Sequence, residues 1–302
     1  MEYGRIVSRA FEIAWRHKWL WLFGMFAAGT GFNLKLEYIL GTSPTNPFDF
    51  QNSAAIDPSQ ILTLYAGLIP FAIIFGCVML LAKGAIIDSV NKIERGGTYS
   101  FASAFSAGID YFLRFLGIGI IFFMIWMAYF IIVVIIVAVC AAVHVALAVM
   151  VGFVAFFLSF LFFIAGTQVM NLAERVVVLR NSGIMDALSE GVQLLKMHFG
   201  KNIAAFFILF GFGIAFGIFT FIFWFMLNFP INSVIQALNV KSFLAMLTAF
   251  ILGLPVSYLL AGFFGLFAET FTTLFYIELV EPKPESAYLP DSLQQGNEPP
   301  VL

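Results

Sequence analysis

The stretch "MDALSEGVQLLKMHFG", residues 185–200, decides the fold, because it places four ionisable side chains between two strongly apolar regions. Around it, apolar residues recur at helical spacing at Ile184, Leu188, Val192, Leu195 and Phe199. The opposite face carries Asp186, Ser189, Glu190, Gln193 and Lys196. This pattern predicts an amphipathic helix. A charge at the bilayer centre costs about 2.5–3.5 kcal/mol on insertion scales, so we expect this helix to lie flat on the membrane surface.

Two earlier stretches repeat the pattern. "RAFEIAW" (residues 9–15) and "SAFSAGI" (residues 103–109) align with "DALSEGV" (residues 186–192). Each copy holds two small residues four positions apart, a spacing that permits close helix contact. These residues are Ala10, Ala14, Ala104, Gly108, Ala187 and Gly191. Chance explains any single pair equally well, because Gly and Ala are abundant here, but the threefold recurrence favours contact along the surface helices.

The composition is that of an integral membrane protein. Of 302 residues, 62% are hydrophobic and 11% are charged, and the mean hydropathy is +0.99, whereas soluble domains are roughly 45–50% apolar. A formal net charge of −2 gives no indication of a nucleic-acid partner or an acidic substrate. The two cysteines, Cys77 and Cys140, both fall in apolar runs, which excludes a disulfide framework or a zinc site built on them.

Six membrane spans follow from the apolar runs, since about 20 apolar residues cross the hydrocarbon core. We expect spans over residues 19–32 and 61–90, two within 112–173, and the last two over 203–227 and 243–279. As one helix, the run 112–173 would be roughly 93 Å long, which suits a hairpin with its turn around Ala142 to Val149. Pro70 and Pro255 are expected to kink their spans.

Each surface helix precedes two spans. We therefore predict an all-α integral membrane protein, with six transmembrane helices arranged as three amphipathic-helix-plus-hairpin repeats. The membrane domain is expected over residues 1–280, in units of about 1–95, 96–180 and 181–280, and the Pro-rich residues 281–302 as a disordered cytoplasmic tail. A cleaved signal peptide is the alternative for the first span, but the recurrence of the segment before it favours an uncleaved span.

The basic residues predict the orientation. Thirteen of the 15 Lys and Arg residues fall on one side of the predicted spans, and only Lys35 and Lys241 fall on the other. Because cationic loops are retained in the cytoplasm, we expect both termini there, in a multi-pass protein of a prokaryotic plasma membrane. The cluster "WRHKWLW", residues 15–21, is typical of an aromatic and cationic anchor at the interface.

One acidic residue lies near the cytoplasmic end of each even-numbered span: Asp88, Glu174 and Glu269. With Arg175 they form a candidate polar cluster at the inner mouth of the bundle, which would bind a cation or a polar head group. The alternative is that each acid caps its span and pairs with a nearby Lys or Arg. His144, in the predicted turn, is a candidate ligand or proton carrier, with simple solvation as the alternative.

The three copies, each of which precedes a two-span hairpin, form a pattern that resembles a known family. Over about residues 1–280 the chain resembles the bacterial membrane domain fused to some glycerophosphodiester phosphodiesterases and its stand-alone relatives of unknown function. The resemblance implies a six-helix membrane domain with interfacial helices. It also implies that catalysis belongs to a separate soluble barrel, which this sequence does not contain, so no catalytic residue carries over.

The expected function is non-enzymatic. We find no P-loop and no HExxH, GxSxG or paired CxxC motif, and we expect no cofactor and no metal site. The leading hypothesis is binding of lipid, or of a membrane-protein partner or second copy, through the cytoplasmic surface helices. The alternative is a small-solute or ion transporter or channel that uses the acidic cluster. An enzyme that acts on lipids is a third hypothesis, and no nucleic-acid partner is expected.

Overall fold

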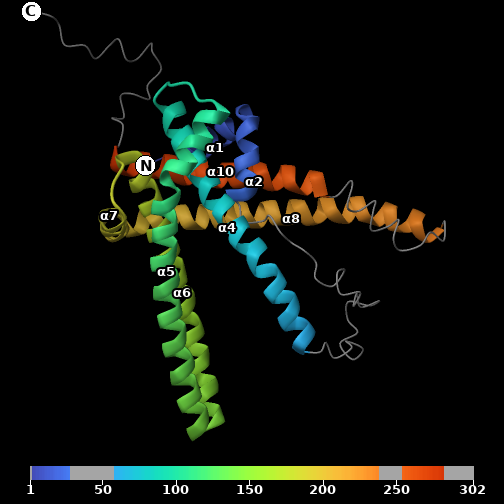
Figure 1. The fold of residues 1–302 in the computed structure, drawn as a ribbon. Helices are drawn as coiled ribbons and strands as arrows, with labels where there is room; N and C mark the ends of the chain where they lie inside the picture. Colours follow the sequence, from blue (N-terminus) through green and yellow to red (C-terminus); the bar gives the residue numbers. More distant parts are fainter. Residues whose placement is uncertain (1, 28–57, 238–253, 282–302) are drawn as a thin grey trace, which may run out of the picture.

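The computed structural model describes residues 2–27, 58–237 and 254–281, and the regular structure in these ranges is entirely helical (Figure 1). The elements are α1 (Tyr3–Arg16), the 3-10 helix η1 (Lys18–Leu20), α2 (Trp21–Ala27), α4 (Pro58–Glu94), α5 (Phe101–Val143), α6 (Val145–Arg180), α7 (Ile184–Met197), α8 (Phe199–Ala237) and α10 (Leu254–Val280). The all-α prediction is confirmed.

Five of these helices are long and apolar enough to cross a membrane, namely α4, α5, α6, α8 and α10. The first of the six predicted spans is described only as far as Ala27, as η1 and α2. Pro70 lies inside α4, which continues through it. The described part of α10 begins at Leu254, so the kink expected at Pro255 falls at the edge of the described residues. The predicted tail, after residue 281, lies outside them.

The turn between the third and fourth predicted spans lies at His144. This residue has an extended backbone, with φ −161° and ψ 132°, and separates α5 from α6. Its Nδ1 accepts a hydrogen bond from the Ala146 N–H at 3.1 Å, so the imidazole caps the start of α6. The predicted turn around Ala142 to Val149 is confirmed.

The second copy of the repeat is not a separate surface helix, which corrects one part of the predicted architecture. The first copy ends at His17 and the third at His198, and both histidines leave helical geometry. At the aligned positions the second copy has Tyr111 and Phe115, and α5 runs unbroken from Phe101 to Val143. Only two of the three copies are therefore independent helices.

The three copies nevertheless pack in the same way, each against a helix that was predicted as an even-numbered span. The start of α5 packs on α4, α7 packs on α6, and α1 returns to pack on α10. Gly191 lets α7 approach α6, because a Cβ there would lie 3.0 Å from the Val169 carbonyl oxygen. A Cβ at Gly108 would clash with the Leu81 carbonyl in the same manner. All six small residues of the repeat are buried.

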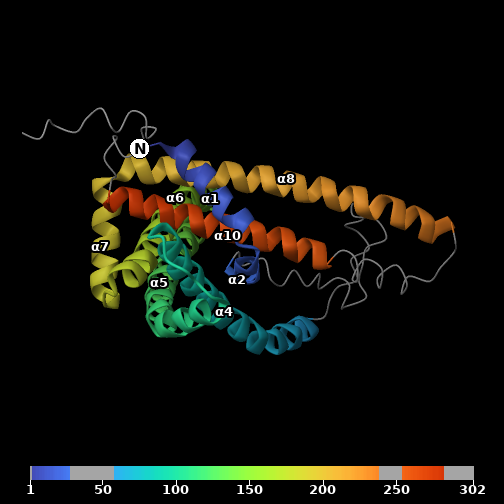
Figure 2. The ribbon, with the colours of Figure 1, turned by 90° about the horizontal axis from the view of Figure 1, so that it is seen from above.

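The hydrophobic core lies where the C-terminal parts of α4, α6 and α10 meet, under α1, α7 and the start of α5. The α5–α6 hairpin extends from this core in one direction. Helices α8 and α10 run side by side, across the direction of the hairpin (Figures 1 and 2). Hardly any residue in the most apolar parts of α5, α6 and α8 is buried by other parts of the protein. This exposure is expected of helices whose surrounding solvent is hydrocarbon.

Candidate functional site: a buried ring of charge and an exposed apolar stripe

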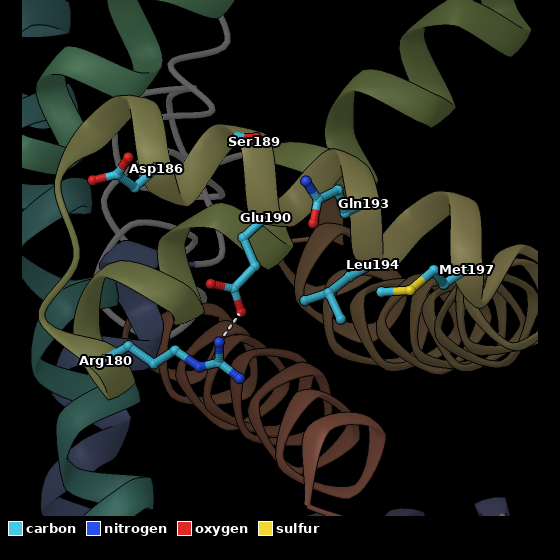
Figure 3. Close-up of a pocket in the computed structure, with 7 residues that line it drawn as sticks. All are labelled: Arg180, Asp186, Ser189, Glu190, Gln193, Leu194 and Met197. Atoms are coloured by element: carbon cyan, nitrogen blue, oxygen red, sulfur yellow. Dashed lines mark ion pairs between the residues drawn. The ribbon is translucent and has the colours of Figure 1, made fainter.

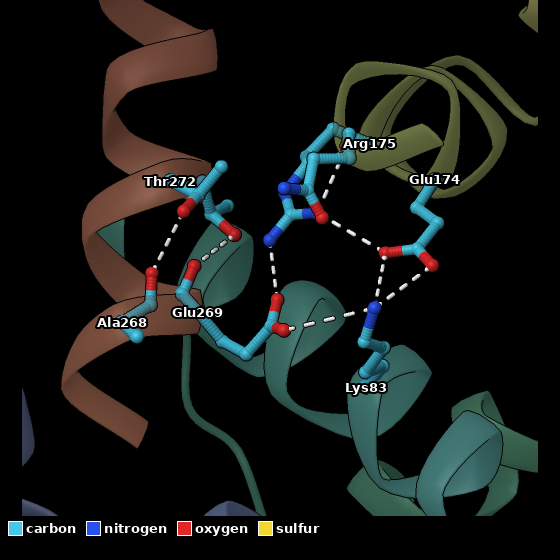
Figure 4. A network of polar contacts seen from close by, with 8 residues as sticks. Lys83, Glu174, Arg175, Ala268, Glu269 and Thr272 are labelled. Atoms are coloured by element: carbon cyan, nitrogen blue, oxygen red, sulfur yellow. Dashed lines mark hydrogen bonds and ion pairs between the residues drawn. The ribbon is translucent and has the colours of Figure 1, made fainter. Parts of the chain in front are cut away.

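Four charged side chains form a closed ring where α4, α6 and α10 meet (Figure 4). Lys83 Nζ donates to both carboxylate oxygens of Glu174, at 3.0 and 3.1 Å. Arg175 donates from Nη1 to Glu174 at 3.2 Å and from Nη2 to Glu269. Lys83 Nζ lies 3.9 Å from Glu269 Oε1 and completes the ring. Cations and anions therefore alternate around it.

The ring is buried and electrically neutral. Its side chains are between 1% and 12% exposed, and two positive charges face two negative charges. Transfer of an isolated charge from water to a low-dielectric interior costs several kcal/mol, and only well-placed partners offset that cost. Arg175 Nη1 also donates to the Asn171 carbonyl at 2.8 Å, while its Nε has no partner among the described residues. The geometry therefore ties three helices together through matched charges.

The structure brings together three of the four residues of the predicted cluster, Glu174, Arg175 and Glu269. Asp88 does not join them: its carboxylate pairs with Lys92 at 2.6 Å, one turn along α4. The reason is helical geometry, because Asp88 follows Lys83 by five residues and so points roughly 140° away from it around the helix. The expectation of one converging acid from each even-numbered span is therefore wrong for α4.

Lys83 is the member of the ring that sequence reasoning missed. It contributed to the prediction of orientation as one of thirteen basic residues, although it lies well inside the apolar run of α4. An ionisable residue inside a span needs a partner of opposite charge, and this requirement could have identified it. The partner itself could not be identified without the fold, because Glu174 lies 91 residues further along the chain.

The second feature is an exposed apolar stripe that recurs in the three copies of the repeat. In each copy the small residues are buried, and large apolar residues that follow them point outward in five of the six cases. The outward residues are Phe11 (49% exposed), Trp15 (57%), Phe105 (45%), Ile109 (53%) and Val192 (37%), with Leu188 partly buried. One face of each copy thus packs on the protein, and the neighbouring face is only partly covered. At α1 this cover is Phe263 of α10, whose ring lies 5.4 Å from Phe11 and 6.2 Å from Trp15 between centroids.

The stripe is most aromatic at α1 and the segment after it. Trp15 lies 6.2 Å from Phe11 and 6.4 Å from Trp21 between ring centroids, and Trp19 is 78% exposed. Trp21 is held by a hydrogen bond from its Nε1 to the Ala14 carbonyl at 2.6 Å. The exposed cation Arg16 lies directly after Trp15 in the chain. Aromatic rings beside cations match the head-group layer of a bilayer.

Ion pairs fix α1 on two of the spans. Arg5 pairs with Glu278 of α10, and Arg9 pairs with Glu94 of α4, both at 2.8 Å. Arg9 also bonds Glu12, and this hydrogen bond is the main reason that the pKa of Glu12 is lowered.

At the end of α1, burial lowers the pKa of His17, with the charges of Arg16 and Arg9 acting in the same direction. His17 Nδ1 lies 2.9 Å from the Tyr99 hydroxyl, which precedes α5. The imidazole therefore joins the end of α1 to Tyr99, just before α5.

Neither the buried ring nor the exposed apolar stripe has the donor set of a metal site. Among the described residues no three His, Cys, Asp or Glu side chains lie close enough to hold a metal ion. Comparison with family models, with curated proteins and with solved structures gives no match for this chain. The resemblance noted from the repeat therefore stays a prediction.

Proposed function

We propose that this chain is a non-enzymatic multi-pass protein of the cell membrane that binds lipid through its surface helices, at the cytoplasmic interface. The observation that supports this most directly is the exposed apolar stripe, which recurs beside buried small residues in all three copies. Large apolar groups left uncovered on a protein surface mark a contact with a partner or a membrane. Here the stripe adjoins membrane-span helices, so the acyl chains of the inner leaflet are its nearest cover.

The three faces of α1 support the same proposal. Viewed along the helix axis, Ile6 and Ala10 face the core, and the ion-paired Arg9 and Glu12 form a polar face. Phe11 lies on a third face, where its ring meets the edge of Phe263 of α10 at 5.4 Å between centroids and stays half exposed. A helix that lies in the membrane interface needs an apolar face for the acyl chains and a polar face for the head groups.

The depth of these faces can be measured directly. In a Cys77→Ala, Cys140→Ala background, Phe11→Cys and Arg16→Cys would each carry an environment-sensitive fluorophore, in vesicles that contain lipids brominated on the acyl chains. We expect strong quenching at position 11 and weak quenching at position 16, because the two lie on different faces of one helix. Equal quenching at both positions, or none at position 11, would contradict the proposal.

A second candidate function is transport of a small solute or ion, and the buried ring favours it. Ionisable residues inside spans commonly mark substrate or ion pathways. In this arrangement, however, Glu174 and Glu269 meet cations of the same protein. The Glu269→Gln variant, reconstituted in liposomes, separates the two candidates: a flux that the wild type shows and the variant loses would support transport, whereas an unchanged flux would remove the ring from the pathway.

A further inference from the structure

The three helices of the buried ring contribute to it from similar places in their sequences. Lys83, Glu174 and Glu269 each end a short motif, namely "LAK" at residues 81–83, "LAE" at 172–174 and "FAE" at 267–269. Each motif lies in the C-terminal half of its helix, α4, α6 or α10, and each of these helices is the second of its predicted unit. The first unit therefore places a cation where the second and third units place carboxylates.

The Lys83 ammonium lies between those two carboxylates (Figure 4). An ammonium group has three N–H donors. Two have acceptors in the carboxylate of Glu174, at 3.0 and 3.1 Å, and the third is left for Glu269 Oε1, at 3.9 Å. Arg175 donates to the other oxygen of Glu269, and Oε1 receives no hydrogen bond from the described residues. Three carboxylate oxygens are therefore arranged around one ammonium nitrogen.

The charges of the ring require one monovalent cation at the position of Lys83. Arg175 contacts both carboxylates, but it carries one positive charge and so neutralises only one of them. Without Lys83 the remaining three charges sum to −1. A monovalent cation restores neutrality, whereas a divalent ion would reverse the imbalance.

Burial makes this position different from the ion pair at α7. The side chains of Glu174 and Glu269 are 3% and 12% exposed. Arg180 and Glu190, in contrast, line an open hollow and are 47% and 25% exposed (Figure 3). Water can solvate either partner of that surface pair, but the carboxylates of the ring depend on a cation for compensation.

The donor set favours an ammonium over a metal ion. The contacts of 3.0 and 3.1 Å are ordinary lengths for N–H···O hydrogen bonds. Among the described residues, no three His, Cys, Asp or Glu side chains are grouped to hold a metal ion. A primary ammonium has one N–H for each of the three carboxylate oxygens.

We infer that Glu174 and Glu269 form a binding site for a primary ammonium ion, and that the first unit of this chain fills the site in cis with the side chain of Lys83. The ligand is thus covalently attached, and the contact joins the first unit to the other two. This inference concerns what the ring holds, and it needs neither lipid binding nor transport. Its consequence is that a free primary ammonium should replace the side chain when Lys83 is shortened.

Chemical rescue of Lys83→Ala in the full chain tests the site. The substitution removes Cγ, Cδ, Cε and Nζ, which together match n-propylammonium. Unfolding by urea in detergent is measured with the chloride of propylammonium or of tetramethylammonium; guanidinium is avoided because it is itself a cation. We expect propylammonium to lower the unfolding constant about tenfold when present at about ten times its dissociation constant. Tetramethylammonium has the same charge but no N–H, and should have no effect.

Two variants are matched controls. Lys83→Ala, Glu174→Gln contains the same cavity beside a neutral ring, so it should not respond to propylammonium. Lys92→Ala removes a lysine from the same helix, and its pair with Asp88 is partly exposed, so this variant should not respond either. The wild type should also show no response, because its site is filled.

Other outcomes overturn the inference. An unfolding constant of Lys83→Ala that propylammonium leaves unchanged, or that both cations lower equally, would exclude an ammonium site. An equal response in the neutral double variant, or a Lys83→Ala chain that does not fold even with propylammonium, would exclude it as well. The two proposals fail separately: quenching at position 11 without rescue removes this inference alone, and rescue without quenching removes lipid binding by the stripe.

Discussion

At the scale of single residues, the ring depends on matched charges rather than on any one member. Lys83 and Arg175 each contact both carboxylates, so every charge has two opposite neighbours. Removal of one member leaves an uncompensated charge in a buried place, whereas removal of one cation and one anion leaves a neutral pair. The two kinds of change therefore have different costs.

We predict that Lys83→Met lowers the free energy of unfolding by about 3–5 kcal/mol, because it leaves two carboxylates for one guanidinium. The double variant Lys83→Met, Glu174→Gln restores neutrality and should recover most of this loss. Denaturant unfolding in detergent measures both. Lys92→Met is the control on the same helix, since its pair with Asp88 is partly exposed and should contribute about 1 kcal/mol or less. Additive losses in the double variant would contradict the coupled ring.

The pKa of His17 gives a prediction of pH dependence. Because its folded-state pKa is lowered below the ordinary value of 6.5, the unfolded chain binds more protons than the folded chain in that range. The stabilisation is fully present above pH 6.5 and is lost as the pH falls through the folded-state pKa. Unfolding measured between pH 7.5 and pH 5 should show this loss, and His17→Gln should reduce it. An identical pH profile in the variant would show that other groups cause it.

The candidate site could be predicted only in part. Glu174, Arg175 and Glu269 were recognisable because charged residues are rare in apolar runs, and α6 and α10 place them on facing sides. Lys83 could have been suspected as an ionisable residue inside a span, but its partner Glu174 could not be identified from the sequence. Which of Lys83 and Asp88 faces the ring depends on the rotation of α4 about its own axis, and its packing on α5, α2 and α10 fixes that rotation.

At the scale of elements, the repeat predicted the contacts better than it predicted the helices. The small residues at positions 108 and 191 lie at the two crossings α4–α5 and α6–α7, as their spacing suggested. The break between surface helix and span, in contrast, depends on the residue at the end of each copy. His17 and His198 leave the helix, whereas Tyr111 and Phe115 continue it.

Two glycines of α5 allow a matched test of the crossing with α4. Gly108→Ala should lower the free energy of unfolding by about 1–3 kcal/mol, because the new methyl group meets the Leu81 backbone, which cannot move away as a side chain would. Gly119→Ala meets no atom within 4 Å and should be neutral or stabilise α5 by up to about 1 kcal/mol. If denaturant unfolding gave equal effects at the two positions, the close approach at Gly108 would not be a source of stability.

At the scale of the whole molecule, the described helices do not share one direction. The α5–α6 hairpin and the α8–α10 pair run across each other (Figures 1 and 2). Transmembrane helices are tilted by about 0–40° from the bilayer normal, so in this arrangement only one of the two directions can follow the normal. Hydropathy predicted six spans, and five of the described helices are long and apolar enough to cross a membrane. The relative directions of these helices were not predictable, because hydropathy contains no information on the angle between helices.

Cysteine labelling tests the orientation of the α5–α6 hairpin. In a background without Cys77 and Cys140, we predict that His144→Cys reacts with a membrane-impermeant maleimide on intact cells. Ser182→Cys, beyond the other end of α6, should react only after the membrane is permeabilised. The reverse pattern would contradict the orientation that the basic residues predict, and equal reactivity from one side would show that α6 does not cross.

The packing of α1 on α10 has a consequence for the synthesis of the chain. The Arg5–Glu278 pair joins residues 273 positions apart. Ribosomes add about 5–20 residues per second, so roughly 14–55 s pass between the emergence of the two partners. Throughout that interval the alanine face of α1 has no final contact, and the nascent chain must hold it against the bilayer or a chaperone. Maturation of the N-terminal end is therefore a late, post-insertion event, although it is translated first.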